Sequence, residues 1–160
     1  MDPIEEARRQ WVEHGWARAA PGMSAVTAIM HAQQVLLARI DEHLAEFDLT
    51  FSRFELLRLL AFTRHGRLPL GKLGVRLQVH ATSVTNAVDR LEAQGHVRRE
   101  RHPTDGRATL ATITPSGTQV VEEATKVLND AVFGDVGLTD RETATLFKLL
   151  AKARVHLESS

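Results

Sequence analysis

Four short polar side chains stand close together near the middle of the chain, on one side of an expected helix. They are Thr82, Ser83, Thr85 and Asn86. The apolar residues Val84, Val88 and Leu91 recur at helical spacing, which buries the opposite side and leaves the polar side chains facing solvent. An asparagine amide can bind adenine through two hydrogen bonds, and threonine methyl groups can contact thymine methyl groups. The chemistry that this helix offers is therefore recognition of base edges in a duplex.

A basic segment follows this helix. Its arginines are Arg98, Arg99, Arg101 and Arg107, and His102 stands among them. An arginine at a loop tip can enter a narrow minor groove, where the negative potential is enhanced. Asp105 carries the wrong charge to face phosphate, so we expect it to cap the turn or to hold Arg107 in place. The alternative is a solvated basic surface on a purely structural hairpin.

Two further basic side chains flank the polar stretch. His80 lies at the start of the expected helix, and Arg90 lies farther along it. From its place farther along the helix, we expect Arg90 to reach a phosphate and not a base. A phosphate contact is also the prediction for His80, with a surface or capping histidine as the alternative.

The elements that must position these side chains follow in a recognisable order. The pattern predicts a helix over 69–77, a turn, a helix over 81–93, and strands over 96–101 and 107–113. Gly95 is suited to end the second helix, and the composition of 103–106 is typical of a hairpin loop. This order is that of a helix-turn-helix followed by a β-hairpin wing, an arrangement that places its second helix in a major groove.

Helices are predicted on both sides of this region. They cover 3–18, 24–47, 52–65, 115–131 and 139–157, with a break at Ala20-Pro21-Gly22 and Ser24 as the cap of the second helix. Thr114 and Pro115 start the fourth, and Thr139 with Glu142 forms a capping box for the last. The expected fold is mainly α with a small β-hairpin wing. The flanking apolar faces exceed what one small domain can cover, which favours a dimer over a monomeric helical bundle.

The composition limits the classes of protein. The 160 residues carry 20 basic and 20 acidic side chains, yet the net charge is −4 over 1–50, +6 over 51–113 and −2 over 114–160. A basic middle part favours an anionic partner there, although chance variation of surface charge is the alternative. Cysteine is absent, which excludes disulfide scaffolds and thiolate metal sites. No apolar run approaches 18 residues and the N-terminus is acidic, so we expect a cytoplasmic protein without a membrane span.

Enzymatic and metal chemistry find little support. The sequence has no Gly-x-Ser-x-Gly motif, no glycine-rich phosphate loop and no His-x-x-x-His pair. We therefore expect no enzyme and no cofactor. The eight histidines are scattered, and a histidine–carboxylate site for a regulatory metal, formed across a subunit boundary, stays open as an alternative.

Several segments together resemble MarR-type transcriptional regulators. They are Ser83–Glu92, Gly95, Pro103–Arg107 and Ile113–Gly117, within a region of tight resemblance that spans about residues 50–120. The resemblance implies one MarR-like domain over 1–160, with a winged helix-turn-helix lobe over 50–113 and dimerisation helices over 1–48 and 114–158. It also implies a homodimeric repressor that binds an inverted repeat and is released by a small ligand.

The same resemblance assigns roles to individual residues. By position, Thr82, Ser83, Thr85 and Asn86 would lie in the major groove. Asp105 and Arg107 would form the wing pair, with Arg107 at the minor groove. Gly106 stands where many members have a second arginine, which removes one cation from the wing tip.

A ligand site is suggested by aromatic residues near the N-terminus. Trp11 and Trp16 could form a wall for a planar aromatic acid, with Arg18 or Arg53 as its counter-charge. The alternative is that the tryptophans pack in a core or a dimer interface. A further alternative for the whole protein is a non-specific or architectural DNA-binding module, whose binding would ignore sequence and weaken sharply with salt.

Overall fold

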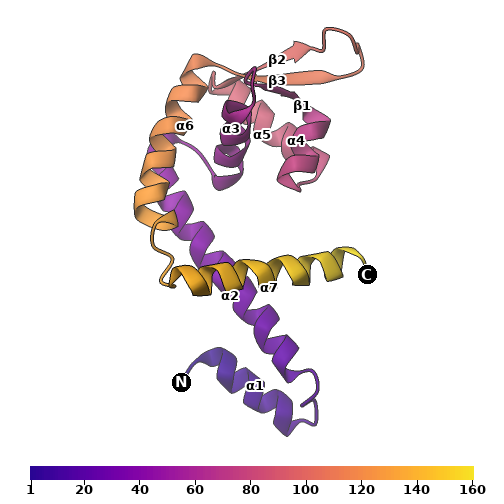
Figure 1. Ribbon diagram of the computed structural model, residues 1–160, viewed down its shortest axis with the longest axis vertical. Helices are drawn as coiled ribbons and strands as arrows, with labels where there is room; N and C mark the ends of the chain where they lie inside the picture. Colours follow the sequence, from indigo (N-terminus) through magenta and orange to yellow (C-terminus); the bar gives the residue numbers. More distant parts are fainter. The chain divides into compact units, whose positions relative to one another are not determined.

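The computed structural model describes residues 1–160 and shows two compact units, Met1–Phe51 and Ser52–Ser160. The first unit is helical, and the second combines helices with a small sheet (Figure 1). None of the helices is both long enough and sufficiently apolar to cross a lipid bilayer.

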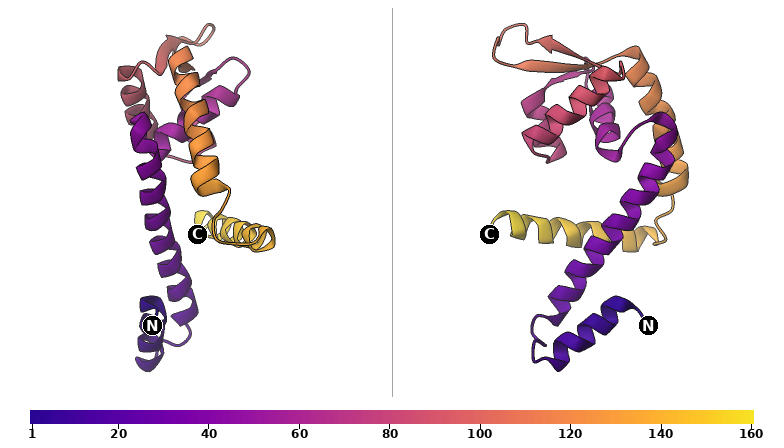
Figure 2. Two further views of the ribbon diagram at one scale, coloured as in Figure 1. Left: turned by 90° about the vertical axis from the view of Figure 1, so that its left-hand side faces the viewer. Right: turned by 180° about the vertical axis from the view of Figure 1, so that it is seen from behind.

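The first unit consists of α1 (Pro3–Glu13), α2 (Ala20–Leu44) and a 3-10 turn (Ala45–Phe47), with α1 packed beside the start of α2 (Figure 2). The Asp2 carboxylate caps α1 by accepting a hydrogen bond from the N–H of Ile4 at 2.9 Å. The prediction of one helix over 3–18 is wrong. Gly15 has a φ of +86°, and this left-handed conformation ends the helix early.

The junction between the first two helices also corrects the sequence analysis. Ala20, Pro21 and Gly22 do not break a helix but form the first turn of α2, where the missing N–H of a proline costs no hydrogen bond. Ser24 is not a cap. It lies inside α2, and its hydroxyl donates a hydrogen bond to the carbonyl of Ala20 at 2.9 Å.

The second unit continues the chain with eight further elements. They are α3 (Phe51–Phe62, which begins at the last residue of the first unit), β1 (Arg67–Pro69), α4 (Leu70–Leu77), α5 (Ala81–Ala93), β2 (Val97–Arg101), β3 (Thr109–Ile113), α6 (Pro115–Leu128) and α7 (Asp140–Glu158). A π-helical turn, Asn129–Phe133, follows α6. The expected helix, turn, helix and two strands are all present at or within two residues of their predicted bounds.

The sheet is antiparallel, with the strand order β1-β3-β2. The hairpin β2–β3 was predicted, and its register pairs Val97 with Ile113 and Arg101 with Thr109. β1 was not predicted, because three residues that end in proline show too little alternation to indicate a strand. β1 pairs with β3 alone, which leaves β2 as an edge strand on the other side.

The core of the second unit forms where α3, α4, α5 and α6 bury one side each. Its fully buried large side chains are Leu56, Leu57, Leu60, Leu73, Val84, Val88, Leu91, Val97, Val121 and Leu128. This core fixes α5 and the base of the hairpin to the same body, since both contribute to it.

The start of α6 passes unusually close to another part of the backbone. Thr114 caps this helix by accepting a hydrogen bond from the N–H of Gly117 at 3.1 Å. A Cβ at Gly117 would stand 2.2 Å from the carbonyl oxygen of His96 and 2.8 Å from Ile113 Cγ1. Only glycine fits there.

Gly117→Ala is therefore expected to lower the free energy of unfolding by roughly 1–3 kcal/mol, because the clash is with a backbone carbonyl that cannot rotate away. The ordinary gain in helix propensity, about 1 kcal/mol, has the opposite sign. Urea denaturation followed by circular dichroism measures the change. Gly71→Ala in α4 is the control, since nothing lies within 4 Å of its Cβ position. Equal midpoints for the two variants would contradict the close approach.

Candidate nucleic-acid interface

α5 has one buried and one exposed side. Val84, Val88 and Leu91 are at most 2% exposed, and they anchor the helix to the core. The exposed side carries the predicted residues Thr82, Ser83, Thr85, Asn86 and Arg90. The Asn86 amide has no partner within the protein, so all its hydrogen-bonding capacity faces outward. The structure thus brings the whole predicted polar set onto one accessible helix face.

α4 holds α5 at close range through a tight turn. Gln78, with a φ of +56°, ends α4, and the N–H of Val79 donates back to the carbonyl of Gly74 at 3.1 Å. A Cβ at Gly74 would stand 3.3 Å from the carbonyl oxygen of Val79 and 3.5 Å from Val84 Cγ2. Glycine at this position therefore lets α4, the turn and α5 pack closely.

His80 is the N-cap of α5. Its Nδ1 accepts a hydrogen bond from the N–H of Thr82 at 3.2 Å. Because Nδ1 is an acceptor, the proton of the neutral ring lies on Nε2, which can donate to an anion outside the protein. The same side chain can thus cap the helix and contact a phosphate.

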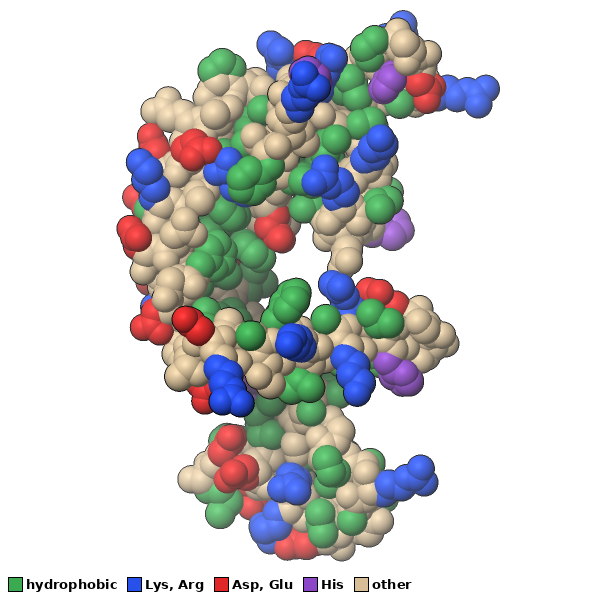
Figure 3. Space-filling view, in the orientation of Figure 1, with side chains coloured by type: hydrophobic (Ala, Val, Ile, Leu, Met, Phe, Trp, Pro, Cys, Tyr) green, Lys and Arg blue, Asp and Glu red, His purple; other side chains and the backbone are tan.

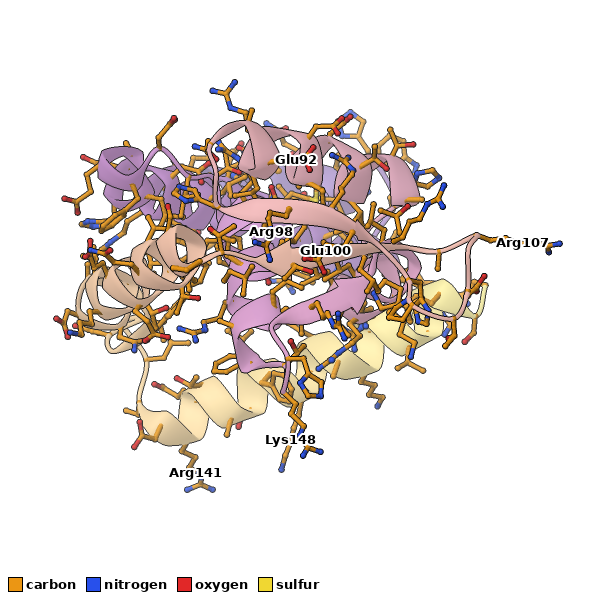
Figure 4. All side chains as sticks on the ribbon, turned by 90° about the horizontal axis from the view of Figure 1, so that it is seen from above. Glu92, Arg98, Glu100, Arg107, Arg141 and Lys148 are labelled. Atoms are coloured by element: carbon orange, nitrogen blue, oxygen red, sulfur yellow. The ribbon has the colours of Figure 1, made fainter.

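The loop between β2 and β3 is held in shape by side-chain acceptors. His102 Nδ1 accepts hydrogen bonds from the N–H groups of Thr104, at 3.2 Å, and Asp105, at 3.0 Å. The Asp105 carboxylate accepts one from the N–H of Arg107 at 3.0 Å. Arg107 is exposed at the tip of the hairpin and points away from the rest of the unit (Figure 4).

Ion pairs divide the cations of this unit into two groups. Arg98 and Arg67 both lie near Glu100, at 3.0 and 3.8 Å, and Arg99 pairs with Asp89 and Glu92. The exposed cations without a carboxylate partner include Arg90, Arg101, Arg107, Lys72 and Arg76. Of the hairpin arginines, the two at its outer end are therefore the ones available to an external anion.

A hollow of about 700 Å³ opens between the start of α4 and the hairpin. It is lined by Pro69, Leu70, Gly71, Lys72, Val75, Arg76, Arg107, Ala108 and Thr109. Lys72 and Arg76 were not singled out from the sequence. Their i, i+4 spacing on a helix was the available signal, but only the fold shows that Arg107 lines the same hollow.

The residues suggested for a ligand pocket are divided between the two units. In the first unit, the rings of Trp11 and Trp16 meet edge to face with centroids 5.3 Å apart, and His14 stacks on Trp16. Arg18 is exposed in the same unit. Arg53 belongs to the second unit, where its guanidinium donates to Gln94 Oε1 at 3.0 Å. No group of three or more His, Asp or Glu side chains in the chain is placed to hold a metal ion.

The core, the adjoining helices α4 and α5, and the hairpin define a winged helix-turn-helix protein. Comparison with known proteins then identifies its family. The model of the MarR family matches residues 47–108. YkoM, an HTH-type transcriptional regulator of Bacillus subtilis, is 32% identical over 106 residues, which cover 66% of this chain and 68% of that protein. The chain spans about half, 49%, of three mycobacterial HTH-type regulators that it also matches.

Solved structures agree with this assignment. Sco5413, a MarR family transcriptional regulator from Streptomyces coelicolor, is 45% identical with a TM-score of 0.77, over 87% of this chain and 96% of that one. A mutant of MarR from E. coli, solved in complex with operator DNA, is 27% identical with a TM-score of 0.72, over 79% and 91%. The chain belongs to the MarR family of transcriptional regulators, as the resemblance implied. This membership also confirms the expectation that it is not an enzyme.

The cap at the start of α5 can be tested on its own. His80→Ala is expected to lower the free energy of unfolding by about 1 kcal/mol, because the N–H of Thr82 loses its acceptor. His80→Asn keeps an acceptor at the same place and should restore most of that loss. Thermal unfolding followed by circular dichroism measures both. If the two variants unfold alike, His80 does not act as the cap.

Proposed function

We propose that the protein is a homodimeric, sequence-specific DNA-binding repressor that recognises an inverted-repeat operator and responds to a small ligand. The observation that carries this proposal is the exposed polar face of α5, whose side chains have little to bind within the protein, next to a hairpin whose outer arginines are unpaired. A surface of this kind is suited to a nucleic-acid duplex.

α5 is the element that we assign to the major groove. Thr82, Ser83, Thr85 and Asn86 are short enough to reach base edges from a helix lying in the groove. Arg90, one turn beyond Asn86, is placed to meet a phosphate. The Nε2–H of His80 offers another phosphate contact at the start of the helix.

The hairpin supplies the minor-groove contact in this proposal. Arg107 at the tip enters the groove, and Asp105 supports the backbone of Arg107. Arg101, at the end of β2, binds a phosphate beside the groove. Lys72 and Arg76 extend the phosphate contacts along α4. The complex of the E. coli MarR mutant with operator DNA supports a duplex as the partner of this fold.

The dimer is inferred from apolar side chains that stay exposed on the flanking helices. On α2 they are Val26, Ile29, Met30, Val35, Leu36 and Leu37, and on α7 they are Leu146, Phe147, Leu149, Leu150, Val155 and Leu157. Hydrophobic side chains are visible along α7 in Figure 3. Helix faces that expose this many apolar side chains are typical of a subunit interface. A two-fold dimer sets two copies of α5 about one helical turn of DNA apart, roughly 34 Å, which requires an inverted repeat.

In this proposal, a small ligand controls DNA binding through the same two-fold geometry. A ligand that binds better when the two copies of α5 are wrongly spaced lowers the DNA affinity by the difference in its binding free energy. The edge-to-face pair Trp11–Trp16, with Arg18 two residues on, provides an aromatic surface for an aromatic acid. A regulator of this kind acts on chromosomal DNA, so the proposed location of the protein is the cytoplasm.

Selection of bound sequences from a pool of random duplexes tests the proposed function. The wild-type protein should enrich an inverted repeat, and Asn86→Ala should lose about 1–3 kcal/mol of discrimination at one position of each half-site. Gln119→Ala on α6 is the control and should leave the selected sequence unchanged. A wild-type pool without a common sequence would support the non-specific alternative. An identical profile for Asn86→Ala would remove Asn86 from the base contacts.

Arg107→Ala is expected to weaken binding to the selected duplex about tenfold, because one contact in the minor groove is lost, while the melting temperature stays unchanged. Fluorescence anisotropy at a fixed salt concentration measures the affinity. Arg98→Ala removes the same charge from the same hairpin, but Arg98 is already paired with Glu100 and should matter less. Equal affinities for wild type and Arg107→Ala would contradict the wing contact.

Leu150→Asp is expected to split the dimer, because it places a charge in the apolar face of α7. Sedimentation velocity at micromolar concentration should then show the monomer mass of 17.8 kDa in place of a dimer. Lys148→Asp on the same helix changes the charge by −2 against −1 for Leu150→Asp, and as the control it should still remain dimeric. A dimeric Leu150→Asp variant would show that α7 is not in the interface.

A further inference from the structure

Two carboxylates lie on the exposed part of α5, where a DNA-binding helix should avoid them. Asp89 and Glu92 have side chains that are 60% and 44% exposed. Each adds a negative charge to the element assigned to the major groove and so repels phosphates. A stabilising contact of these carboxylates within the protein would offset this repulsion.

Both carboxylates bind the same arginine of the hairpin. Arg99 Nη2 donates to Asp89, and Arg99 Nη1 donates to Glu92 Oε1 at 2.9 Å. The other carboxylate oxygen of Glu92 accepts the backbone N–H of Arg99 at 3.0 Å. Glu92 thus holds both the side chain and the main chain of one residue of β2. Bidentate contacts of this kind fix geometry as well as charge.

The position of β2 in the sheet makes this attachment important. β2 is an edge strand, with β3 as its only strand neighbour. Alternate residues of a strand face opposite sides, so Arg98 and Glu100 pair with each other on one side while Arg99 meets α5 on the other. Figure 4 shows Arg98 and Glu100 on β2 and Glu92 on α5.

Partial burial disfavours the charged form of Arg99, but its bonds to the two carboxylates outweigh that effect. Desolvation lowers the pKa of Arg99, the hydrogen bonds to Asp89 and Glu92 raise it, and the net pKa lies above its ordinary value. Both terminal nitrogens of the guanidinium donate to carboxylates of α5, which favours an indirect contribution of Arg99 to DNA binding.

We propose that Arg99 is a positioning residue, which, with Asp89 and Glu92, fixes the hairpin against α5 so that the major-groove and minor-groove contacts engage one duplex together. This inference rests on the proposed function. The contact between α5 and β2 sets the direction in which the hairpin extends, and Arg107 lies eight residues beyond Arg99 at its tip. A small rotation of β2 would therefore displace the tip from the groove.

Positioning and simple electrostatics predict opposite signs for the same substitutions. Asp89→Asn and Glu92→Gln each remove a negative charge near the phosphates, which by charge alone should tighten binding. If the carboxylates hold the hairpin, both variants should instead bind the selected duplex about three- to tenfold more weakly, the range expected for losing a partly exposed charged hydrogen bond. Anisotropy at a fixed salt concentration measures the affinity, and circular dichroism confirms that the variants are folded.

Arg99→Gln and Arg98→Gln form the matched pair for the arginine itself. Both remove one positive charge from β2, but only Arg99→Gln breaks the contact with α5. We expect Arg99→Gln to weaken binding more than Arg98→Gln, and Arg99→Lys to recover part of the difference, because a lysine retains one ion pair.

A double-mutant cycle with Arg107→Ala shows whether the effect acts through the hairpin tip. Once Arg107 is absent, Asp89→Asn should cost little further affinity. Tighter or unchanged binding by the folded Asp89→Asn and Glu92→Gln variants would overturn the inference, as would a full loss that persists without Arg107. Failure of the wild-type protein to bind any selected duplex would instead overturn the proposed function.

Discussion

The burial of one side of α5 is the constraint on which the rest of the interface depends. Val84, Val88 and Leu91 lie in the core, and their burial on one side of the helix leaves the polar residues on the other side facing solvent. Gly74 allows α4 to support this helix at close range, and the tight turn after α4 leaves little freedom in where α5 begins. A helix fixed in this way presents its side chains to a groove without a conformational search, which lowers the entropic cost of binding.

Which cations can bind an external anion depends on which of them are already paired with carboxylates, more than on how many cations there are. The chain is neutral overall, and even in its basic middle part several arginines are engaged by carboxylates. Arg98 and Arg99 are adjacent in the sequence, yet one bonds within its own strand and the other bonds to α5. The unpaired arginines of the hairpin, Arg101 and Arg107, lie at its outer end. Local structure thus selects which of several equivalent side chains can meet an external anion.

The sequence predicts the parts of the fold that are governed by local rules. The periodicity of α5, the loop chemistry at 103–106 and the capping residues Thr114 and Thr139 each depend on a few neighbouring positions, and all agree with the structure. Pro21 shows the limit, since proline both disrupts a helix and starts one. β1 and the contact of Arg99 with Asp89 and Glu92 could not be predicted, because they depend on segments that meet only after folding.

The hairpin has one consequence beyond recognition. β2 has no neighbouring strand at its outer edge, although Glu92 accepts the N–H of Arg99 there. An edge with unpaired backbone groups can template strand addition by another molecule. The charged side chains of Arg98, Arg99, Glu100 and Arg101 make such an approach unfavourable, because a second copy that paired in register would bring like charges face to face. A charged run of this kind disfavours fibrillar association through the edge, and this solubility requirement constrains which side chains the strand can accept.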